Sequence, residues 1–222
     1  MIAKFCGATT EAEIAEMAAA GADLVGLWHG VPGGRAELTA ARLTDLASLA
    51  LAGGGLRPML VTFSSDTRAL LAAVTAARLP GVQLHGFQPP GTVGALRRDG
   101  PPGLEIVKVL HLRDGVCLEE RLTGAYERAG ADCFLLDTAT ADGRVGSTAE
   151  PLADAAVVAL ADRTGLPFLL AGGLRADNAG DFAQTRAHPR FLGIDVDSAA
   201  RDGNGPLRAD RARAVVHAWR TV

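Results

Sequence analysis

Hydrophobic and polar residues follow two alternating patterns along this chain. Short apolar runs recur roughly every 20 to 35 residues, and each is followed by a segment whose Ala, Leu and Arg residues are spaced as in an amphipathic helix. Strands are predicted at residues 3–6, 23–28, 59–63, 81–85, 104–110, 133–137, 168–171 and 191–196. Helices are predicted at residues 10–20, 37–52, 66–78, 89–98, 115–129, 151–163, 176–187 and 206–220. Such alternation is typical of a parallel α/β sheet.

Eight strands, each followed by a helix, favour a closed (β/α)8 TIM barrel, with residues 1–222 as a single domain. The alternative α/β architecture is an open doubly wound sheet, which binds a nucleotide at a Gly-rich first turn. Here the first strand is followed by Cys6-Gly7-Ala8-Thr9, which lacks that glycine pattern. The sequence therefore favours the barrel over the open sheet.

Composition and charge exclude several classes of partner. The formal net charge is -3, and no run of Lys and Arg is interleaved with aromatic residues, so we expect no nucleic-acid partner. Apolar stretches fall far short of the roughly 20 residues that a membrane span needs. Glu11, Glu13 and Glu16 stand where a signal peptide would be apolar. We therefore expect a cytoplasmic protein without a membrane partner.

The spacing of cysteines and histidines indicates neither a disulfide framework nor a metal site. Cys6, Cys117 and Cys133 form no close pair, and the five histidines show no ligand spacing. Because a free cysteine is commonly a small buried apolar residue, we interpret Cys117 and Cys133 in that way. We expect no metal and no cofactor.

Cys6 and Asp137 differ from the other acid-base residues because each ends a predicted strand. In a parallel barrel, catalytic groups lie at the carboxyl ends of the strands. Lys4 is two residues before Cys6 and so shares its face of the strand, which predicts that the two side chains are neighbours. A competing interpretation of Asp137 is that it caps the following turn.

Six segments, in their order and spacing, resemble the phosphoribosylanthranilate isomerase family of tryptophan biosynthesis. They are Lys4-Phe5-Cys6-Gly7, Ala20-Gly21-Ala22-Asp23-Leu24-Val25-Gly26, Val82-Gln83-Leu84-His85-Gly86, Phe134-Leu135-Leu136-Asp137, Leu170-Ala171-Gly172-Gly173-Leu174 and Gly193-Ile194-Asp195-Val196. The resemblance covers almost the whole chain. It implies a (β/α)8 isomerase that converts N-(5-phosphoribosyl)anthranilate to 1-(2-carboxyphenylamino)-1-deoxyribulose 5-phosphate by an Amadori rearrangement.

The resemblance also implies an acid-base pair. Cys6 would be the general base at the sugar C2′, and Asp137 the general acid at the ring oxygen. The chemistry fits these residue types: a thiolate can remove such a proton if its pKa is brought below about 8.5. Apolar neighbours such as Phe134 could keep the carboxyl of Asp137 protonated.

Substrate-binding residues are implied by the same resemblance. Arg35, in the loop after the second strand, would bind the anthranilate carboxylate in its bidentate fork. Lys4, His85 and Asp195 would lie around the ligand. For Arg35 and His85, a solvated loop arginine and a hydrogen-bonded structural histidine remain the competing interpretations.

Two loops are predicted to hold the phosphate of the substrate. Gly172 and Gly173 follow the seventh strand and can bring backbone N–H groups to an anion. The resemblance adds Ser198 and, less closely, Ala199 after the eighth strand. Barrels commonly bind phosphate with these two loops.

The chain departs from the family pattern in the ligand loops. Trp28 and His29 are unusual in the loop after strand two, Gly146-Ser147-Thr148-Ala149 replaces a Gly-Gly-Thr-Gly stretch, and Arg201 stands where the family has Glu, which inverts a charge near the phosphate end. These changes leave open a paralogue that acts on a related glycosyl phosphate or on a substituted anthranilate, and a noncatalytic barrel that binds a sugar phosphate. The histidine-pathway isomerase uses two aspartates, so Cys6 argues against it. We expect a phosphorylated small molecule as the partner and a monomer or homodimer.

Overall fold

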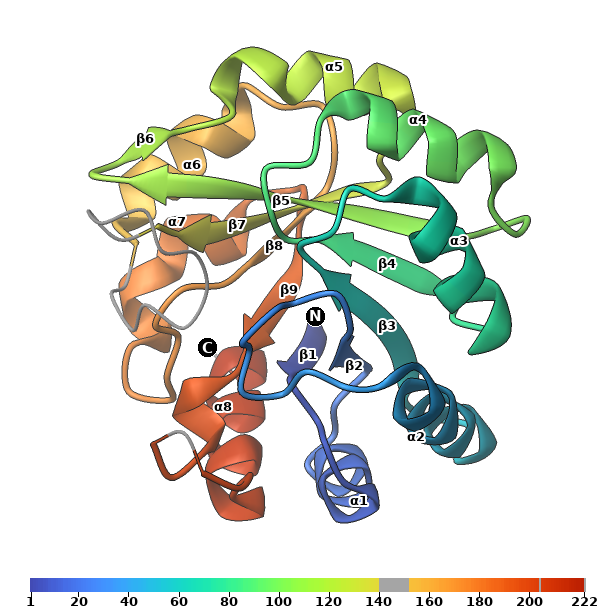
Figure 1. The fold of residues 1–222 in the computed structure, drawn as a ribbon. Helices are drawn as coiled ribbons and strands as arrows, with labels where there is room; N and C mark the ends of the chain where they lie inside the picture. Colours follow the sequence, from blue (N-terminus) through green and yellow to red (C-terminus); the bar gives the residue numbers. More distant parts are fainter. Residues whose placement is uncertain (140–151, 204, 222) are drawn as a thin grey trace.

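Eight parallel strands form a closed ring in the computed structural model, which describes residues 1–139, 152–203 and 205–221 (Figure 1). The ring consists of β1 (Ile2–Cys6), β2 (Leu24–Trp28), β3 (Arg57–Thr62), β4 (Gly81–Leu84), β5 (Glu105–Arg113), β7 (Cys133–Thr138), β8 (Phe168–Leu170) and β9 (Phe191–Val196). Pairing of β1 with β9 and of β4 with β5 closes the barrel. The TIM-barrel prediction is confirmed.

Helices surround this ring (Figure 1). They are α1 (Glu11–Ala19), α2 (Ala40–Ala52), α3 (Thr67–Ala76), α4 (Pro90–Asp99), α5 (Thr123–Ala129), α6 (Asp154–Asp162), α7 (Ala183–Ala187) and α8 (Ala209–Thr221). The first three begin at side-chain caps, since Thr10, Thr39 and Asp66 each accept a hydrogen bond from the backbone N–H three residues later. Across the described parts of the chain, every helix is too short or too polar to cross a membrane.

The predicted helix at 115–129 is wrong in its first half. The chain turns at Asp114 and Gly115, both with positive φ, and returns as the short antiparallel strand β6 (Val116–Cys117) beside β5. A 3-10 turn at Glu120–Leu122 then leads into α5. The apolar positions that suggested one helix therefore belong to three short elements.

Other predicted helices also begin later than expected, and in two of them hydrogen bonds explain the delay. Residues 176–187 hold a 3-10 turn at Ala179–Phe182 followed by α7, because Asn178 accepts from the Arg175 N–H and donates to the Gly173 carbonyl, which delays the helix. The helix predicted from residue 37 begins at Ala40, because the carboxylate of Glu37 instead binds the N–H groups of Gly30 and Val31.

The strands separate two apolar cores. The larger core lies between strands and helices and includes Phe5 and Phe134. The smaller core fills the barrel interior with Leu24, Met59, Val107, Val109, Cys133, Leu135, Leu169 and Ala171. Because side chains alternate along a strand, Asp137 shares the inward face of Cys133 and Leu135. The same alternation directs Lys4 and Cys6 inward. The three cysteines are free and buried, as predicted for Cys117 and Cys133.

Candidate active site

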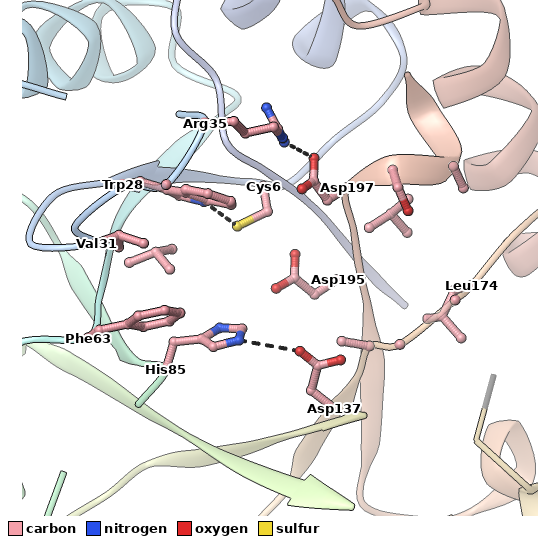
Figure 2. A pocket seen from close by; sticks show the side chains of 18 of the residues that line it. Cys6, Trp28, Val31, Arg35, Phe63, His85, Asp137, Leu174, Asp195 and Asp197 are labelled. Atoms are coloured by element: carbon pink, nitrogen blue, oxygen red, sulfur yellow. Dashed lines mark hydrogen bonds and ion pairs between the residues drawn. The ribbon is translucent and has the colours of Figure 1, made fainter. Parts of the chain in front are cut away.

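A cavity of about 370 Å³ opens at the carboxyl ends of the strands (Figure 2). Its walls include nine of the predicted site residues, namely Cys6, Arg35, His85, Asp137, Gly172, Gly173, Asp195, Ser198 and Ala199. Lys4, the tenth, is completely buried and is absent from the walls. The fold thus gathers residues from the first and last strands around one cavity.

Lys4 and Asp195 form a buried ion pair beneath Cys6. The Nζ of Lys4 is 2.7 Å from the Oδ2 of Asp195. Gly26 faces this group from β2, and a β-carbon at that position would lie 3.1 Å from the Lys4 Nζ and 2.8 Å from the Cys6 Sγ. Lys4 therefore neighbours Cys6, as strand alternation predicts. Although burial lowers the pKa of Lys4, its pKa is raised overall because Asp195 and Cys6 attract the ammonium.

Cys6 is held as a neutral thiol in the free protein. Burial raises its pKa to about 12, and the carboxylates of Asp195 and Asp197 act in the same direction. Lys4 and the indole of Trp28 oppose this rise. A thiolate in the free protein would require a lowered pKa, whereas the pKa of Cys6 is raised. For Cys6 to act as a base, neighbouring groups must therefore stabilise its thiolate form.

Trp28 connects Cys6 with the predicted carboxylate-binding arginine. Its indole Nε1–H donates a hydrogen bond to the Sγ of Cys6 at 3.0 Å (Figure 2). The guanidinium carbon of Arg35 lies 5.1 Å from the centre of the Trp28 ring. Arg35 also forms an ion pair with Asp197. The sequence marked Trp28 as an unusual loop residue but gave no sign that it contacts Cys6, and it did not single out Asp197.

Asp137 faces His85 at the other side of the cavity. The Oδ2 of Asp137 is 3.4 Å from the Nε2 of His85, and its Oδ1 accepts the Thr138 N–H at 2.8 Å. The Nδ1 of His85 is 3.0 Å from the Nε2 of Gln83, which fixes the ring. Asp137 is 4% exposed, so its carboxyl is desolvated on most sides.

A second buried pair lies next to His85 and was missed by the sequence analysis. The Nδ1 of His111 on β5 is 2.6 Å from a carboxylate oxygen of Glu119, and both side chains are almost fully buried. The His85 and His111 rings meet edge to face with centroids 5.8 Å apart. The turn that places Glu119 over β5 is the one that was predicted as a helix.

The two predicted phosphate loops line the same end of the cavity. Gly172 and Gly173 have φ values of 85° and 61°, and a β-carbon on Gly172 would lie 2.6 Å from the Thr138 hydroxyl. A smaller hollow shares Gly173, Ser198 and Ala199 with the main cavity. A glycine is therefore required at 172 for the backbone to approach β7.

Arg201 is fully engaged inside the protein. It is 2% exposed, forms an ion pair with Glu13, and donates to Asp197 at 2.9 Å and to the Gly7 carbonyl at 2.8 Å. The carboxylates of Glu13 and Asp197 therefore balance the positive charge of Arg201, which the sequence analysis expected near the phosphate of the substrate. The loop at Gly146–Ala149 lies outside the described residues. Within the described residues, no three His, Cys, Asp or Glu side chains are grouped as metal ligands.

Comparison with known proteins identifies the family. A family model for N-(5'-phosphoribosyl)anthranilate (PRA) isomerase matches residues 3–216. The N-(5'-phosphoribosyl)anthranilate isomerase of Afipia carboxidovorans is 33% identical over 223 residues, covering 100% of this chain and 90% of that protein. The phosphoribosyl anthranilate isomerase structure from Thermus thermophilus has a TM-score of 0.78 at 24% identity, covering 98% of both chains. A phosphoribosyl anthranilate isomerase in complex with reduced 1-(o-carboxyphenylamino)-1-deoxyribulose 5-phosphate has a TM-score of 0.76 at 19% identity, covering 100% of both chains. This chain belongs to the N-(5'-phosphoribosyl)anthranilate isomerase family.

Proposed function

We propose that this chain catalyses the Amadori rearrangement of N-(5-phosphoribosyl)anthranilate, with Asp137 as the general acid and Cys6 as the general base. The observation that carries the proposal is that Cys6 and Asp137 face one cavity from different strands, in a member of this isomerase family. An acid and a base on separate walls can act on different atoms of one substrate without neutralising each other.

Asp137 acts first, at the furanose ring oxygen. Its proton moves to that oxygen as the bond to C1′ breaks, and the nitrogen lone pair forms the C1′–N double bond of a Schiff base. The Nε2 of His85 lies 3.4 Å from the carboxyl oxygen of Asp137, where it can stabilise the carboxylate that forms.

Cys6 acts in the second step. Its thiolate takes the proton from C2′, and the electrons of that C–H bond move to C1′ and the nitrogen to give the enolamine. Transfer of the C2′ hydroxyl proton and protonation of C1′ then give the ketone. The Lys4 ammonium, next to the sulfur, stabilises the thiolate form that this step consumes.

Charged groups at the two ends of the cavity orient the substrate. Arg35 binds the anthranilate carboxylate, and its stacking on Trp28 together with the Asp197 ion pair sets its direction. Gly172, Gly173 and Ser198 bind the phosphate. We place the enzyme in the cytoplasm, because a phosphorylated substrate does not cross a membrane unaided. We propose that it acts as a monomer or homodimer.

The test is a single-turnover and steady-state assay with freshly made phosphoribosylanthranilate, followed by loss of its fluorescence. We expect turnover by the parent and a loss of kcat of roughly 10²- to 10⁴-fold in Cys6→Ser and Asp137→Asn. Cys133→Ser and Asp181→Asn, which change the same residue types away from the cavity, are the matched controls. A folded parent that leaves the substrate unchanged would refute the proposal.

A further inference from the structure

The indole of Trp28 is directed at the sulfur of Cys6, which it approaches to 3.0 Å (Figure 2). An indole N–H can only donate, so the sulfur is the acceptor in this contact. A sulfur accepts more strongly as a thiolate than as a thiol, because the charge assists the hydrogen bond. The contact therefore favours the deprotonated form of Cys6.

Two groups around Cys6 favour its thiolate form, namely the Lys4 ammonium, which has the larger effect, and the indole N–H of Trp28. Lys4 on β1 supplies a positive charge, but its ammonium is 2.7 Å from the carboxylate of Asp195 on β9. Asp195 and Asp197 both disfavour a second negative charge nearby. The guanidinium of Arg201 is directed at backbone carbonyls, Glu13 and Asp197.

We infer that Trp28 is a positioning residue for the general base: its indole N–H holds the Cys6 sulfur in place and stabilises it as the thiolate that removes the C2′ proton. That the thiolate removes the C2′ proton rests on the proposed function. That Trp28 stabilises the thiolate does not depend on that function. The proton released from Cys6 goes to solvent when the thiolate forms, and the sulfur regains one from C2′ during the reaction.

The same ring stacks under Arg35, with 5.1 Å between the guanidinium carbon and the ring centre. A carboxylate bound by Arg35 would therefore lie beside the indole that contacts the base. Trp28 thus sets the distance between the aryl end of the substrate and Cys6, in addition to its effect on the sulfur. Trp28 therefore contacts both Arg35, which binds the substrate, and Cys6, which removes the proton.

The direct test measures the reactivity of Cys6 in the intact protein. Parent, Trp28→Phe and Trp28→Leu are treated with iodoacetamide from pH 7 to pH 9.5, and the Cys6 peptide is quantified by mass spectrometry. Trp28→Phe keeps a ring of similar shape without the N–H. We expect its alkylation rate to be about tenfold below that of the parent at each pH, since hydrogen bonds to charged groups are worth roughly that factor or more. Phe87→Leu, which changes an exposed aromatic residue outside the cavity walls, should react at the parental rate.

Access to the sulfur is controlled by Trp28→Leu, which opens the wall more than Phe does. If access alone governed the rate, both Trp28 variants would react faster than the parent, and Leu the faster of the two. Parental or faster alkylation in Trp28→Phe would overturn the inference. With phosphoribosylanthranilate as substrate, we expect kcat of Trp28→Phe to fall about tenfold as the thiolate fraction falls.

The two proposals fail in distinguishable ways. If the parent does not consume phosphoribosylanthranilate while Trp28→Phe slows alkylation tenfold, the proposed function is wrong and the effect of Trp28 on the thiol stands. If the parent turns over and Trp28→Phe keeps both the parental alkylation rate and the parental kcat, the role of Trp28 is wrong and the proposed function stands.

Discussion

Gly26 and Cys6 are paired across β1 and β2 so closely that a β-carbon on Gly26 would lie 2.8 Å from the Cys6 sulfur. Gly26→Ala therefore cannot be accommodated without moving the sulfur, and the same methyl group would press on the Lys4 ammonium at 3.1 Å. We expect kcat to fall by about 10²-fold, because small displacements of a reacting group are costly, and stability to fall by about 1–3 kcal/mol. Steady-state kinetics and urea denaturation measure the two effects.

Gly94 in α4 is the matched control for that substitution. A β-carbon there would meet no atom within 4 Å, and the residue lies inside a helix. Gly94→Ala should keep full activity and gain roughly 0.5–1 kcal/mol of stability. Parental kcat in Gly26→Ala would show that the sulfur can shift without consequence.

Arg35 should not be replaceable by lysine. A guanidinium can stack on Trp28, pair with Asp197 and still present a planar fork to a carboxylate, whereas an ammonium cannot do all three. For Arg35→Lys we expect KM for phosphoribosylanthranilate to rise at least about tenfold, with a smaller change in kcat. Arg78→Lys, far along the chain in the connection after α3, is the control. An unchanged KM in Arg35→Lys would argue against a carboxylate at this position.

Glu13 and Arg201 form a buried ion pair that joins α1 to the loop after β9. Removing the Glu13 charge leaves the Arg201 guanidinium with one of its two carboxylate partners, Asp197, so we expect Glu13→Gln to lose about 2–4 kcal/mol of unfolding free energy at pH 7. Urea denaturation would measure it. Glu11→Gln, which loses an exposed pairing with Arg42, should change stability much less.

The pH dependence of the Glu13 effect has a definite sign. Burial raises the pKa of Glu13, but hydrogen bonds from Thr9 and the Arg201 charge outweigh burial and lower it overall. A carboxyl whose folded-state pKa is lowered stabilises the protein above its unfolded pKa of about 4.3 and loses this contribution as the pH falls. The stability gap between parent and Glu13→Gln should therefore narrow below about pH 4. A gap that stays constant down to pH 3 would contradict this account.

The buried thiols predict a loss of stability at high pH. Burial raises the pKa of Cys133 to about 12, while the unfolded chain releases this proton near pH 8.5. A raised folded-state pKa contributes stability that is complete below the unfolded pKa and is lost as the pH rises toward the folded one. Cys133→Ala should therefore show a shallower fall in unfolding free energy between pH 9 and pH 11, by up to about 1.4 kcal/mol per pH unit. Equal slopes in parent and variant would refute the assignment.

The barrel and the positions of Cys6 and Asp137 at strand ends could be predicted, because both follow from the pattern of neighbouring residues in the sequence. Apolar residues from Phe134 onward specify a buried strand, and Asp137 follows on the inward face by the two-residue period of a strand. The β5–β6 turn could also have been found, since Asp114-Gly115 is a dipeptide that favours hairpins. The helical spacing of the apolar residues after it outweighed that signal.

The contacts between distant segments could not be predicted. Arg201 looked like a lone charge near the phosphate because its partner Glu13 lies 188 residues earlier. The direction of the Trp28 indole depends on the pairing of β1 with β2, which fixes Cys6 opposite Gly26. Neither the Arg201–Glu13 contact nor the Trp28–Cys6 contact can be inferred from residue spacing in one sequence. Each depends on how the strands pair in the closed ring.

The ion pair between Lys4 and Asp195 links β9, the last strand of the ring, to β1, the first, across 191 residues of chain. During synthesis, Lys4 and Cys6 emerge first, and the carboxylate that compensates Lys4 arrives only after seven other strands have been made. A partly assembled barrel would have to bury an unmatched ammonium, which is costly, so β1 has reason to stay solvated until β9 can dock. The surroundings of Cys6 are therefore complete only when β9 pairs with β1 and closes the ring.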